Sequence, residues 1–349
     1  MNQSKITGMG MYVPANVVTN DDLSKVMDTN DEWIRERTGI QQRRYATRFE
    51  ENTTIMASKA AAIAIENAGI TAQDIDFLIF ATLSPDYYFP GCGVLLQRQL
   101  GMREIGALDV RNQCSGFIYS ISIADQFIKT GMYKNILVVG AETHSYGLDF
   151  SNTGRNVSVI FGDGAGAVVL QPASKEGQGI LSTHLHSNGS GAELLTMINP
   201  GFHTGCFEPS RKPPHPTQPY GDMFLTSDQI AAHDFYPYMD GQAVFKKAIE
   251  KFPEVIYEAL NTHGYKPSDI NMLIPHQANL RISQFVQHKL NLRDDQVYNN
   301  IQRYGNTTSA SIPIALYEAW KEGHIKEDDL VCLAAFGSGY TWGSVLIKW

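Results

Sequence analysis

The sequence lacks the features of a membrane-spanning or secreted protein. None of its apolar runs approaches the ~18 residues that a helix needs to cross a bilayer. The N-terminal stretch MNQSKITGMGMYVPANVV has no basic segment followed by an apolar core, which is the pattern of a secretory signal. We therefore expect a cytoplasmic protein that has no membrane partner.

Cysteine is scarce. The 4 cysteines, Cys92, Cys114, Cys206 and Cys332, are scattered through 349 residues without paired spacing. Disulfide frameworks are typical of short secreted chains, so we expect reduced thiols here. Each cysteine is then either a buried apolar residue or a reactive group.

Positively charged residues are fewer than negatively charged ones. The 28 Lys and Arg residues are outnumbered by 36 Asp and Glu, and the formal net charge is -8 at pH 7. This balance argues against nucleic acid as a partner, although a local basic patch can serve an acidic protein. The length allows two core-forming units of roughly 150 residues each.

Cofactor motifs are missing as well. The glycine-rich run GDGAG, residues 162–166, lacks the spacing of a nucleotide-binding loop and reads as a tight turn. His184 and His186 alternate on one predicted strand, but they do not make four ligands at metal spacing. The same holds for a loop cluster of His203, Cys206 and His215. We expect neither a metal nor a separate cofactor.

The chain does contain one pattern twice. AIENAGITAQDIDFLIFA, residues 64–81, resembles ALNTHGYKPSDINMLIPH, residues 259–276. CSGFIYSISIADQFIKTG, residues 114–131, likewise matches NTTSASIPIALYEAWKEG, residues 306–323. The offsets of 195 and 192 residues are too long for a solenoid repeat and favour two similar α/β halves. Chance similarity between α/β units is the alternative.

Cys114 stands where an extended run turns into a helix. Apolar residues recur after it at i+3, i+4 and i+7, and Gly131 is a natural stop. The positive end of such a helix stabilises a thiolate, so we expect a lowered pKa for Cys114. In the repeat pattern Cys114 and Asn306 begin equivalent helices and His276 follows a buried strand, so all three can face one cleft.

Seven motifs extend in order over nearly the whole chain. They are NDEWIRERTGI (30–40), CSGF (114–117), IFGDGAGAVVL (160–170), STHLHSNG (182–189), IPHQANLRI (274–282), RYGNTTSASIPIAL (303–316) and FGSGYTWGSVLIKW (336–349). In these motifs the chain resembles the condensing enzymes of the thiolase superfamily, specifically 3-oxoacyl-[acyl-carrier-protein] synthase III. The resemblance implies an α/β protein with a thiolase-like five-layered αβαβα fold from two duplicated halves, residues 1–175 and 176–349. A Pro-rich insertion at residues 200–240 is either a lid or edge of the acyl pocket, or a solvated loop.

The resemblance implies that Cys114 is the catalytic nucleophile and that His276 and Asn306 complete the site. A thiolate exchanges readily with an acyl-CoA thioester and leaves an acyl group reactive enough for carbon–carbon bond formation. His276 and Asn306 would donate hydrogen bonds to the enolate oxygen that forms when a malonyl thioester loses carbon dioxide. Backbone N–H groups of Cys114 and Ser338 would make a second oxyanion hole, with Ser338 where the family frequently has glycine.

Further residues resemble a CoA site. Trp33 and Arg155 resemble the pair that sandwiches the CoA adenine, and Thr29 and Arg37 lie near its phosphates. Asn279 resembles the residue that orders a water beside the catalytic histidine. The alternative for each is an ordinary surface or core residue.

The remaining assignments concern partners. Phe89 resembles a residue that reaches over the acyl pocket of a partner subunit, which implies a homodimer; an ordinary core aromatic is the alternative. Lys246, Arg281 and Lys289 are candidates for binding an acidic acyl carrier protein. Ordinary solvated charges are the alternative for these three.

The resemblance thus implies an acyltransferase that condenses an acyl-CoA primer with malonyl-[acyl-carrier protein] and initiates fatty acid biosynthesis. The Cys, His and Asn set is shared by the priming enzymes and plant-type polyketide synthases, whereas elongating ketosynthases generally use two histidines. The local motifs favour the priming type. Two alternatives are a condensing or acyl-transfer enzyme of a secondary pathway (polyketide, resorcinol or quinolone type) and a non-catalytic thiolase-like binding subunit.

Overall fold

The computed structural model describes residues 3–201 and 227–349. Residues 202–226, which make up much of the predicted insertion, lie outside the described residues, and so do His203, Cys206 and His215.

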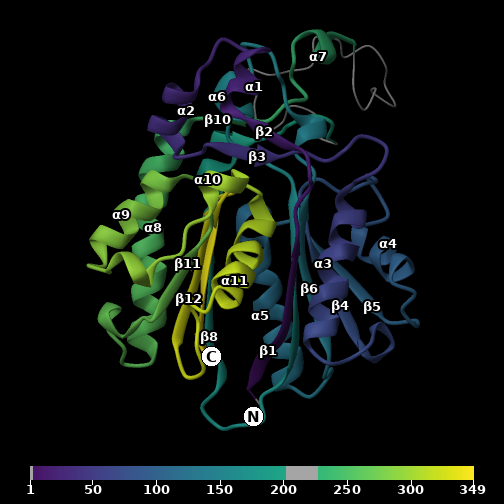
Figure 1. Ribbon diagram of the computed structural model, residues 1–349, viewed down its shortest axis with the longest axis vertical. Helices are drawn as coiled ribbons and strands as arrows, with labels where there is room; N and C mark the ends of the chain where they lie inside the picture. Colours follow the sequence, from purple (N-terminus) through teal and green to yellow (C-terminus); the bar gives the residue numbers. More distant parts are fainter. Residues whose placement is uncertain (1–2, 202–226) are drawn as a thin grey trace.

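Two β-sheets form the centre of the molecule (Figure 1). The first has the strand order β1-β7-β6-β4-β5 and the second β11-β12-β13-β8. Strand β4 is parallel to β5 and β6, strand β11 is parallel to β12, and the other pairs in these sheets are antiparallel. The strands are β1 (Ser4–Tyr12), β4 (Phe77–Ala81), β5 (Gly106–Val110), β6 (Ile136–Glu142), β7 (Gly164–Pro172), β8 (Gly179–Ser187), β11 (Met272–Pro275), β12 (Leu330–Gly337) and β13 (Thr341–Lys348).

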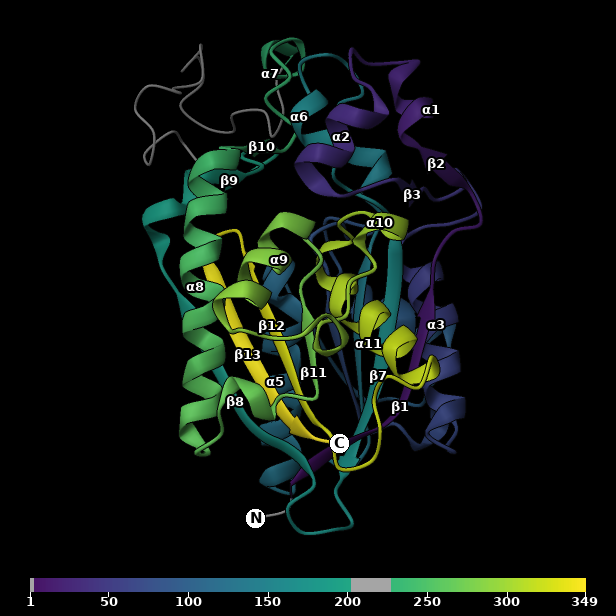
Figure 2. The ribbon, with the colours of Figure 1, turned by 60° about the vertical axis from the view of Figure 1, so that its left-hand side comes forward.

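Helices complete five layers. Two lie between the sheets, α5 (Gly116–Lys129) and α11 (Ser311–Lys321). Figures 1 and 2 show α3 (Thr53–Asn67) and α4 (Cys92–Gln99) outside the first sheet, and α8 (Gly241–Thr262) and α9 (Leu280–Lys289) outside the second. The predicted five-layered αβαβα fold is confirmed.

Burial explains the two innermost helices. In α5 the side chains of Phe117, Ile118, Ile121 and Ala124 are fully buried and join a core shared by both sheets. A helix that is apolar over most of its surface is stable only when both sides are covered, as here. No helix in the described part of the chain is long and apolar enough to cross a bilayer.

Short elements form a cap at one end of the molecule, away from the two chain termini (Figure 1). Strand β2 pairs with β3 and β9 pairs with β10, both antiparallel. The cap elements are β2 (Val17–Thr19), α1 (Asn20–Ser24), α2 (Asp31–Thr38), β3 (Gln42–Arg44), α6 (Arg155–Ser158), β9 (Leu195–Thr196), α7 (Ser227–Ala231), β10 (Tyr238–Met239) and α10 (Ile301–Tyr304).

The internal repeat is visible in the backbone. Gln113 and Thr308 have φ angles of 43° and 48° and begin the 3₁₀ turns that lead into α5 and α11. They are 195 residues apart, the offset of the first repeat. Helix α11 has 11 residues against 14 in α5, so the glycines that follow the helices, Gly131 and Gly323, are only 192 residues apart.

This difference corrects the alignment of the two halves. At the helix starts Cys114 corresponds to Ser309, and Asn306 lies three residues before that position. The prediction that Cys114 and Asn306 begin equivalent helices is therefore wrong. The sequence comparison aligned Gly131 with Gly323 at the helix ends, and this alignment concealed the difference between the 14 residues of α5 and the 11 residues of α11.

Candidate active site

Cys114, His276 and Asn306 line one cavity of about 130 Å³. Cys114 lies between β5 and α5, His276 directly follows β11, and Asn306 follows α10. The structure therefore brings together the three residues that sequence analysis placed in a shared cleft. Apolar side chains complete much of the wall, among them Phe161, Leu195, Val244, Phe252 and Phe336.

Cys114 is held in close contact with the second half of the chain. A Cβ atom on Gly337 would lie 2.6 Å from the Cβ and 3.1 Å from the Sγ of Cys114, so only glycine allows this approach. The backbone N–H groups of Cys114 and Ser338 lie near enough to the sulfur to favour its ionised form. The Ser338 hydroxyl instead donates to the Leu195 carbonyl. Two backbone donors thus lie beside the sulfur.

The pKa of the thiol differs from the sequence-based expectation. Burial and the nearby Glu142 raise the pKa of Cys114 to about 12, and the two backbone N–H groups offset only part of that rise. The expected lowering is therefore wrong. The sequence shows a helix after Cys114, but it does not show that the sulfur is shielded from water, and desolvation opposes a thiolate.

His276 is buried and presents one ring nitrogen to the cavity. Its backbone N–H donates to the Ala334 carbonyl of β12 over 2.8 Å, and Nδ1 lies 2.6 Å from Ser311 Oγ. Nε2 is buried and has no hydrogen-bond partner among the described residues. Burial lowers the pKa of His276 to about 3, so the ring is neutral at physiological pH.

Asn306 is fixed through its backbone and its side-chain oxygen. Its N–H donates to the Ile160 carbonyl over 2.9 Å, and its carbonyl accepts from Gly162 N–H over 3.1 Å. The Oδ1 atom accepts a 2.8 Å hydrogen bond from the Thr308 N–H. Within the described ranges the Nδ2 group has no partner, so it is available as a donor.

A cleft of about 760 Å³ adjoins this cavity. The cleft and the cavity share lining residues, including Ile160, Met239, Phe245 and Asn279, so the two spaces meet. Trp33, Arg37 and Arg281 line the cleft farther out. The arrangement is a wide cleft leading to a small, mostly apolar chamber that contains one thiol and two unpartnered nitrogen groups.

Comparison with known proteins agrees with this geometry. The sequence profile of 3-Oxoacyl-[acyl-carrier-protein (ACP)] synthase III matches residues 108–189, and the profile of its C-terminal part matches residues 260–349. The beta-ketoacyl-[acyl-carrier-protein] synthase III of Aquifex aeolicus is 43% identical over 346 residues, which cover 99% of each chain. The chain belongs to the 3-oxoacyl-[acyl-carrier-protein] synthase III family.

Solved structures of this family superpose on nearly the whole chain. The synthase III from Aquifex aeolicus has a TM-score of 0.86 at 42% identity and covers 99% of this chain and 100% of its own. That from Thermus thermophilus has a TM-score of 0.85 at 36% identity, with 99% of each chain covered.

Of the predicted CoA residues, Trp33, Arg37 and Asn279 line the outer cleft. The guanidinium carbons of Arg37 and Arg155 lie 4.5 and 5.2 Å from the centre of the Trp33 ring. Asn279 is the N-cap of α9, and its Nδ2 donates to the Arg37 carbonyl over 2.8 Å. Thr29 does not line the cleft, and its buried hydroxyl has no partner among the described residues.

The predicted partner residues are on the surface. Phe89 lies between β4 and α4, is 81% exposed and lines neither the cavity nor the cleft. Arg281 lies at the cleft with its guanidinium 5.7 Å from the Phe245 ring of α8. Lys246 and Lys289 are exposed.

The histidines considered as metal ligands have another role. His184 Nδ1 and His186 Nε2 lie 3.3 and 2.6 Å from the two carboxylate oxygens of Glu258 on α8. Among residues 3–201 and 227–349, no group of three or more His, Cys, Asp or Glu side chains is placed to hold a metal ion.

Sequence reasoning missed several residues of the site. Ser311 contacts His276, from which it is separated by 35 residues in the sequence. The backbone N–H of Thr308 holds the Asn306 side chain. Glu142 lies near Cys114. Ser311 and Thr308 belong to the motif RYGNTTSASIPIAL, but no local pattern connects them with specific partners. Only Glu142, a charged residue ending an otherwise apolar strand, was visible as unusual.

Proposed function

We propose that this chain condenses an acyl-CoA primer with malonyl-[acyl-carrier protein], releasing CoA and carbon dioxide and forming 3-oxoacyl-[acyl-carrier protein] at the start of fatty acid biosynthesis. The observation that carries the proposal is the convergence of Cys114, His276 and Asn306 on one buried cavity. Similarity of 43% over full length to beta-ketoacyl-[acyl-carrier-protein] synthases III favours this activity over a secondary pathway.

Loading uses the thiol and the backbone donors. The Cys114 sulfur attacks the carbonyl carbon of the acyl-CoA thioester, and the carbon–sulfur bond to CoA breaks. The oxygen that becomes negative meets the N–H groups of Cys114 and Ser338, which lie beside the sulfur. Because the pKa of the thiol is raised, its proton leaves as the new bond forms and ends on the CoA thiol.

Condensation uses the side-chain donors. Loss of carbon dioxide from the malonyl thioester leaves an enolate, whose oxygen accepts hydrogen bonds from His276 Nε2 and Asn306 Nδ2. Neither nitrogen group has another partner in the described structure. The enolate carbon then attacks the acyl carbonyl on Cys114, and the carbon–sulfur bond breaks so that Cys114 leaves as a thiolate. The thiolate takes up one proton from solvent, which restores the thiol favoured by its raised pKa. Donors fixed before the charge develops stabilise it most effectively.

We propose that Trp33, Arg37 and Arg155 bind the nucleotide part of CoA. An inserted adenine needs two stacking contacts of about 3.5 Å each, which the 5.2 Å between Arg155 and the Trp33 ring does not allow. The Arg155 side chain must therefore move outward by about 2 Å when adenine enters. The exposed Arg37 and the half-buried Arg155, which also pairs with Asp28, supply charge for the phosphates.

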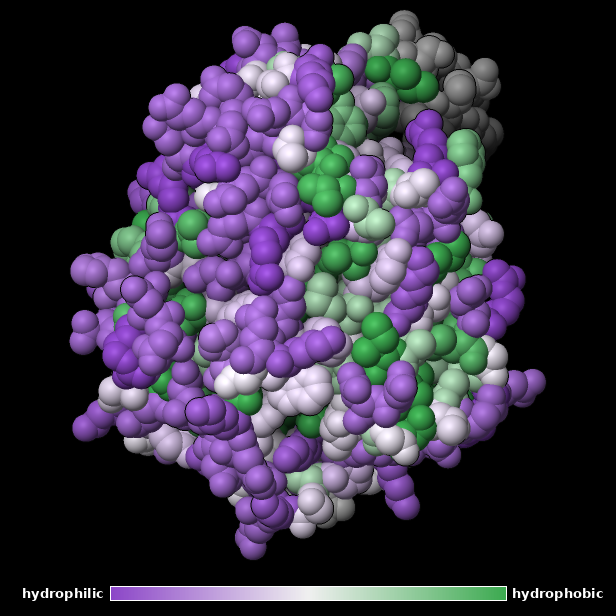
Figure 3. All heavy atoms as spheres, in the orientation of Figure 1, coloured by the Kyte–Doolittle hydropathy of each residue, from purple (hydrophilic) through white to green (hydrophobic). Residues whose placement is uncertain are grey.

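We propose that acyl carrier protein docks beside the cleft. Arg281, Phe285 and Lys289 follow one another at intervals of four residues on α9, so they lie along one face. Lys246 is an exposed residue of α8, next in sequence to Phe245, which Arg281 contacts. Figure 3 shows a largely hydrophilic surface on this side of the molecule. Local basic charge lets a chain of net charge -8 attract an acidic partner.

We propose that two copies form a homodimer through β5. This strand is the edge of the first sheet, and exposed strand edges favour pairing with another strand. Next to it, Tyr87, Tyr88 and Phe89 are 54%, 50% and 81% exposed. Figure 3 shows more hydrophobic residues on the α3 and α4 side than over α2 and α9. A clustered aromatic surface of this kind marks a protein interface.

The three residues of the cavity should separate the two half-reactions. Cys114→Ala should abolish acyl transfer, read as the acyl mass on the intact protein. His276→Ala and Asn306→Ala should retain loading but lose malonyl decarboxylation by about 10²–10³-fold each, the scale of one oxyanion donor. Equal damage to both half-reactions would show that these side chains serve the thiol instead.

Substrate KM values should separate the two docking sites. Arg281→Glu with Lys289→Glu should raise the KM for malonyl-[acyl-carrier protein] about tenfold at low salt, less at high salt, and leave loading unchanged. Arg155→Ala should do the reverse and raise only the KM for acyl-CoA.

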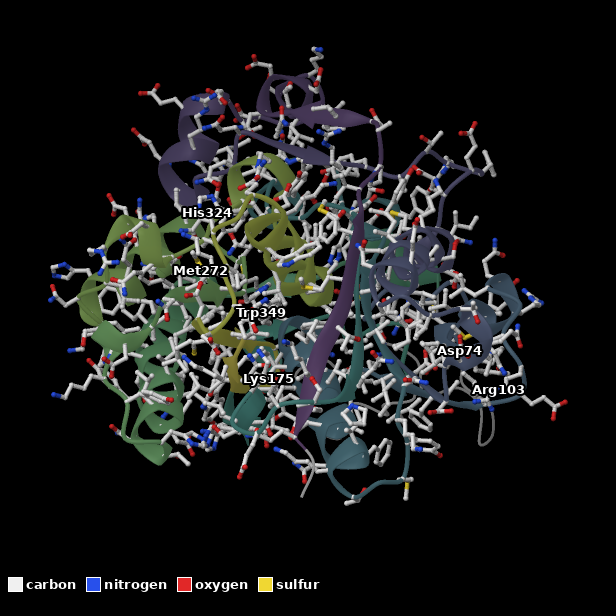
Figure 4. The ribbon with its side chains drawn as sticks, turned by 60° about the horizontal axis from the view of Figure 1, so that its bottom comes forward. Asp74, Arg103, Lys175, Met272, His324 and Trp349 are labelled. Atoms are coloured by element: carbon white, nitrogen blue, oxygen red, sulfur yellow. The ribbon has the colours of Figure 1, made fainter. Side chains whose placement is uncertain are left out.

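The matched control for these variants is Arg103→Glu with Lys175→Glu. Figure 4 shows both residues at the end of the molecule opposite the cap. Each makes a surface ion pair, with Asp76 and Glu327 respectively, so little stability is lost. If this control and the α9 variant raise the carrier-protein KM equally, the α9 patch is not the docking site.

The oligomeric state tests the interface. The 38.7 kDa chain should sediment as a dimer, and Tyr87→Glu with Phe89→Glu should shift it to the monomer because charge opposes burial of this surface. Met132→Glu, at another exposed apolar residue, should leave the dimer intact. A wild-type monomer at micromolar concentration would refute the assignment.

We propose that the enzyme works in the cytoplasm and without a cofactor other than its CoA thioester substrate. Every step above uses a thiol, amide or imidazole of this chain. Activity should therefore survive dialysis against a chelator and should be recovered in the soluble cell fraction. Loss of activity that added metal restores would contradict the proposal.

A further inference from the structure

The Ser311 hydroxyl lies between two nitrogen atoms at the back of His276. Ser311 is the first residue of α11, and its Oγ is 2.6 Å from His276 Nδ1. The same oxygen accepts a 3.3 Å hydrogen bond from the backbone N–H of Gln277. Ser311 and His276 are only 2% and 3% exposed, so no bulk water competes for these contacts.

These contacts decide where the hydroxyl hydrogen goes. A hydroxyl has one hydrogen and two lone pairs, and a backbone N–H can only donate. Gln277 therefore occupies one lone pair of Ser311. Among the described residues His276 Nδ1 is the remaining partner of this hydroxyl, so the Ser311 hydrogen points to it. Nδ1 is then an acceptor, and the proton of the neutral ring is on Nε2.

We propose that Ser311 is a positioning residue that fixes His276 in the tautomer protonated at Nε2. His276 can then donate a hydrogen bond into the cavity, but Nε2 cannot accept the proton of Cys114. The consequence for decarboxylation rests on the proposed function, whereas the tautomer itself does not.

The opposite tautomer would leave a buried group unpaired. With the proton on Nδ1, Ser311 would accept from both His276 and Gln277, and its own hydrogen would have no acceptor among the described residues. A buried polar hydrogen enclosed by protein without a partner is strongly disfavoured. The hydrogen on Nε2 differs, because it faces the cavity, where water or substrate can accept it. The Gln277 donor is itself held in place, because the side chain of Gln277 donates to the Pro275 carbonyl and accepts from the Asn300 N–H.

The other half of the chain shows that the fold does not require this pair. At the constant offset of 195 residues, Ser311 and His276 correspond to Gly116 and Ala81. These also adjoin, since a Cβ on Gly116 would lie 3.2 Å from the Ala81 Cβ. Helix α5 thus begins without a serine at this position. The hydroxyl is present only in the half that carries the histidine.

Nitrogen NMR on the full chain tests the tautomer directly. With ¹⁵N-labelled histidine, the His276 signal is identified by its absence in His276→Gln. We expect the nitrogen signals of an unprotonated Nδ1 and a protonated Nε2. These signals should not change between pH 8 and pH 5, because burial lowers the pKa of His276 to about 3. A proton on Nδ1 in the wild-type protein would overturn the proposal.

Variants test the role of the hydroxyl. Ser311→Ala should mix the tautomers and slow malonyl decarboxylation by up to about 10²-fold, the cost of weakening one donor, with acyl loading unchanged. Ser311→Thr should restore both readouts, and Ser120→Ala, which removes a buried hydroxyl from α5, should change neither. If Ser311→Ala leaves tautomer and decarboxylation unchanged, Ser311 does not position His276. If the proton is on Nε2 but the protein does not decarboxylate malonyl-[acyl-carrier protein], the proposed function is refuted and the tautomer assignment stands.

Discussion

The close contact between the helix start of each half and a strand of the other half is the constraint on which the rest of the structure depends. Both helices begin between the two sheets, where β6 meets the turn before α11 and β12 meets the turn before α5. A Cβ on Gly140 would lie 2.3 Å from the Ser309 carbonyl oxygen, and one on Gly337 would lie 2.6 Å from the Cys114 Cβ. Ordinary contacts need about 3.5 Å, so only glycine permits this approach. Because the backbones meet here, residues far apart in the sequence reach one cavity.

The two sides of this contact use equivalent positions in opposite ways. Cys114 packs against Gly337 and faces the cavity, whereas its counterpart Ser309 hydrogen-bonds over 2.6 Å to Glu142, the counterpart of Gly337. Glu142 also accepts hydrogen bonds from residues 82–84, so this buried carboxyl ties the loop after β4 to the start of α11. Satisfied buried polar groups make an arrangement rigid and unique. One side of the pseudo-symmetric contact therefore supplies rigidity, and the other is free for chemistry.

Much of this arrangement was predictable from the sequence, for identifiable reasons. The apolar period after Cys114 predicted a buried helix, and the repeat predicted two halves that share a cleft. The position of His276 after a buried strand and the resemblance to synthase III placed His276 and Asn306 beside the thiol, whereas the helix-start alignment used for Asn306 was wrong by three residues. The direction of the Cys114 pKa was not predictable, because desolvation depends on the whole surrounding wall. The contact between Ser311 and His276 was also invisible, since it joins the end of a strand to a helix start 35 residues later.

The arrangement of the cavity and the cleft suits the covalent intermediate of the proposed reaction. The chamber of about 130 Å³ contains the thiol and both side-chain donors and meets the cleft at shared residues, so both substrates use the same space in turn. The first acyl group must therefore stay behind while its CoA leaves by the cleft, and the Cys114 sulfur provides the attachment. The donors on His276 and Asn306 then serve the second substrate in the same space. A base close to the sulfur would favour hydrolysis of the waiting thioester. In the proposed reaction a neutral histidine that donates from Nε2 would not activate water in this way, which would protect the intermediate between the two half-reactions.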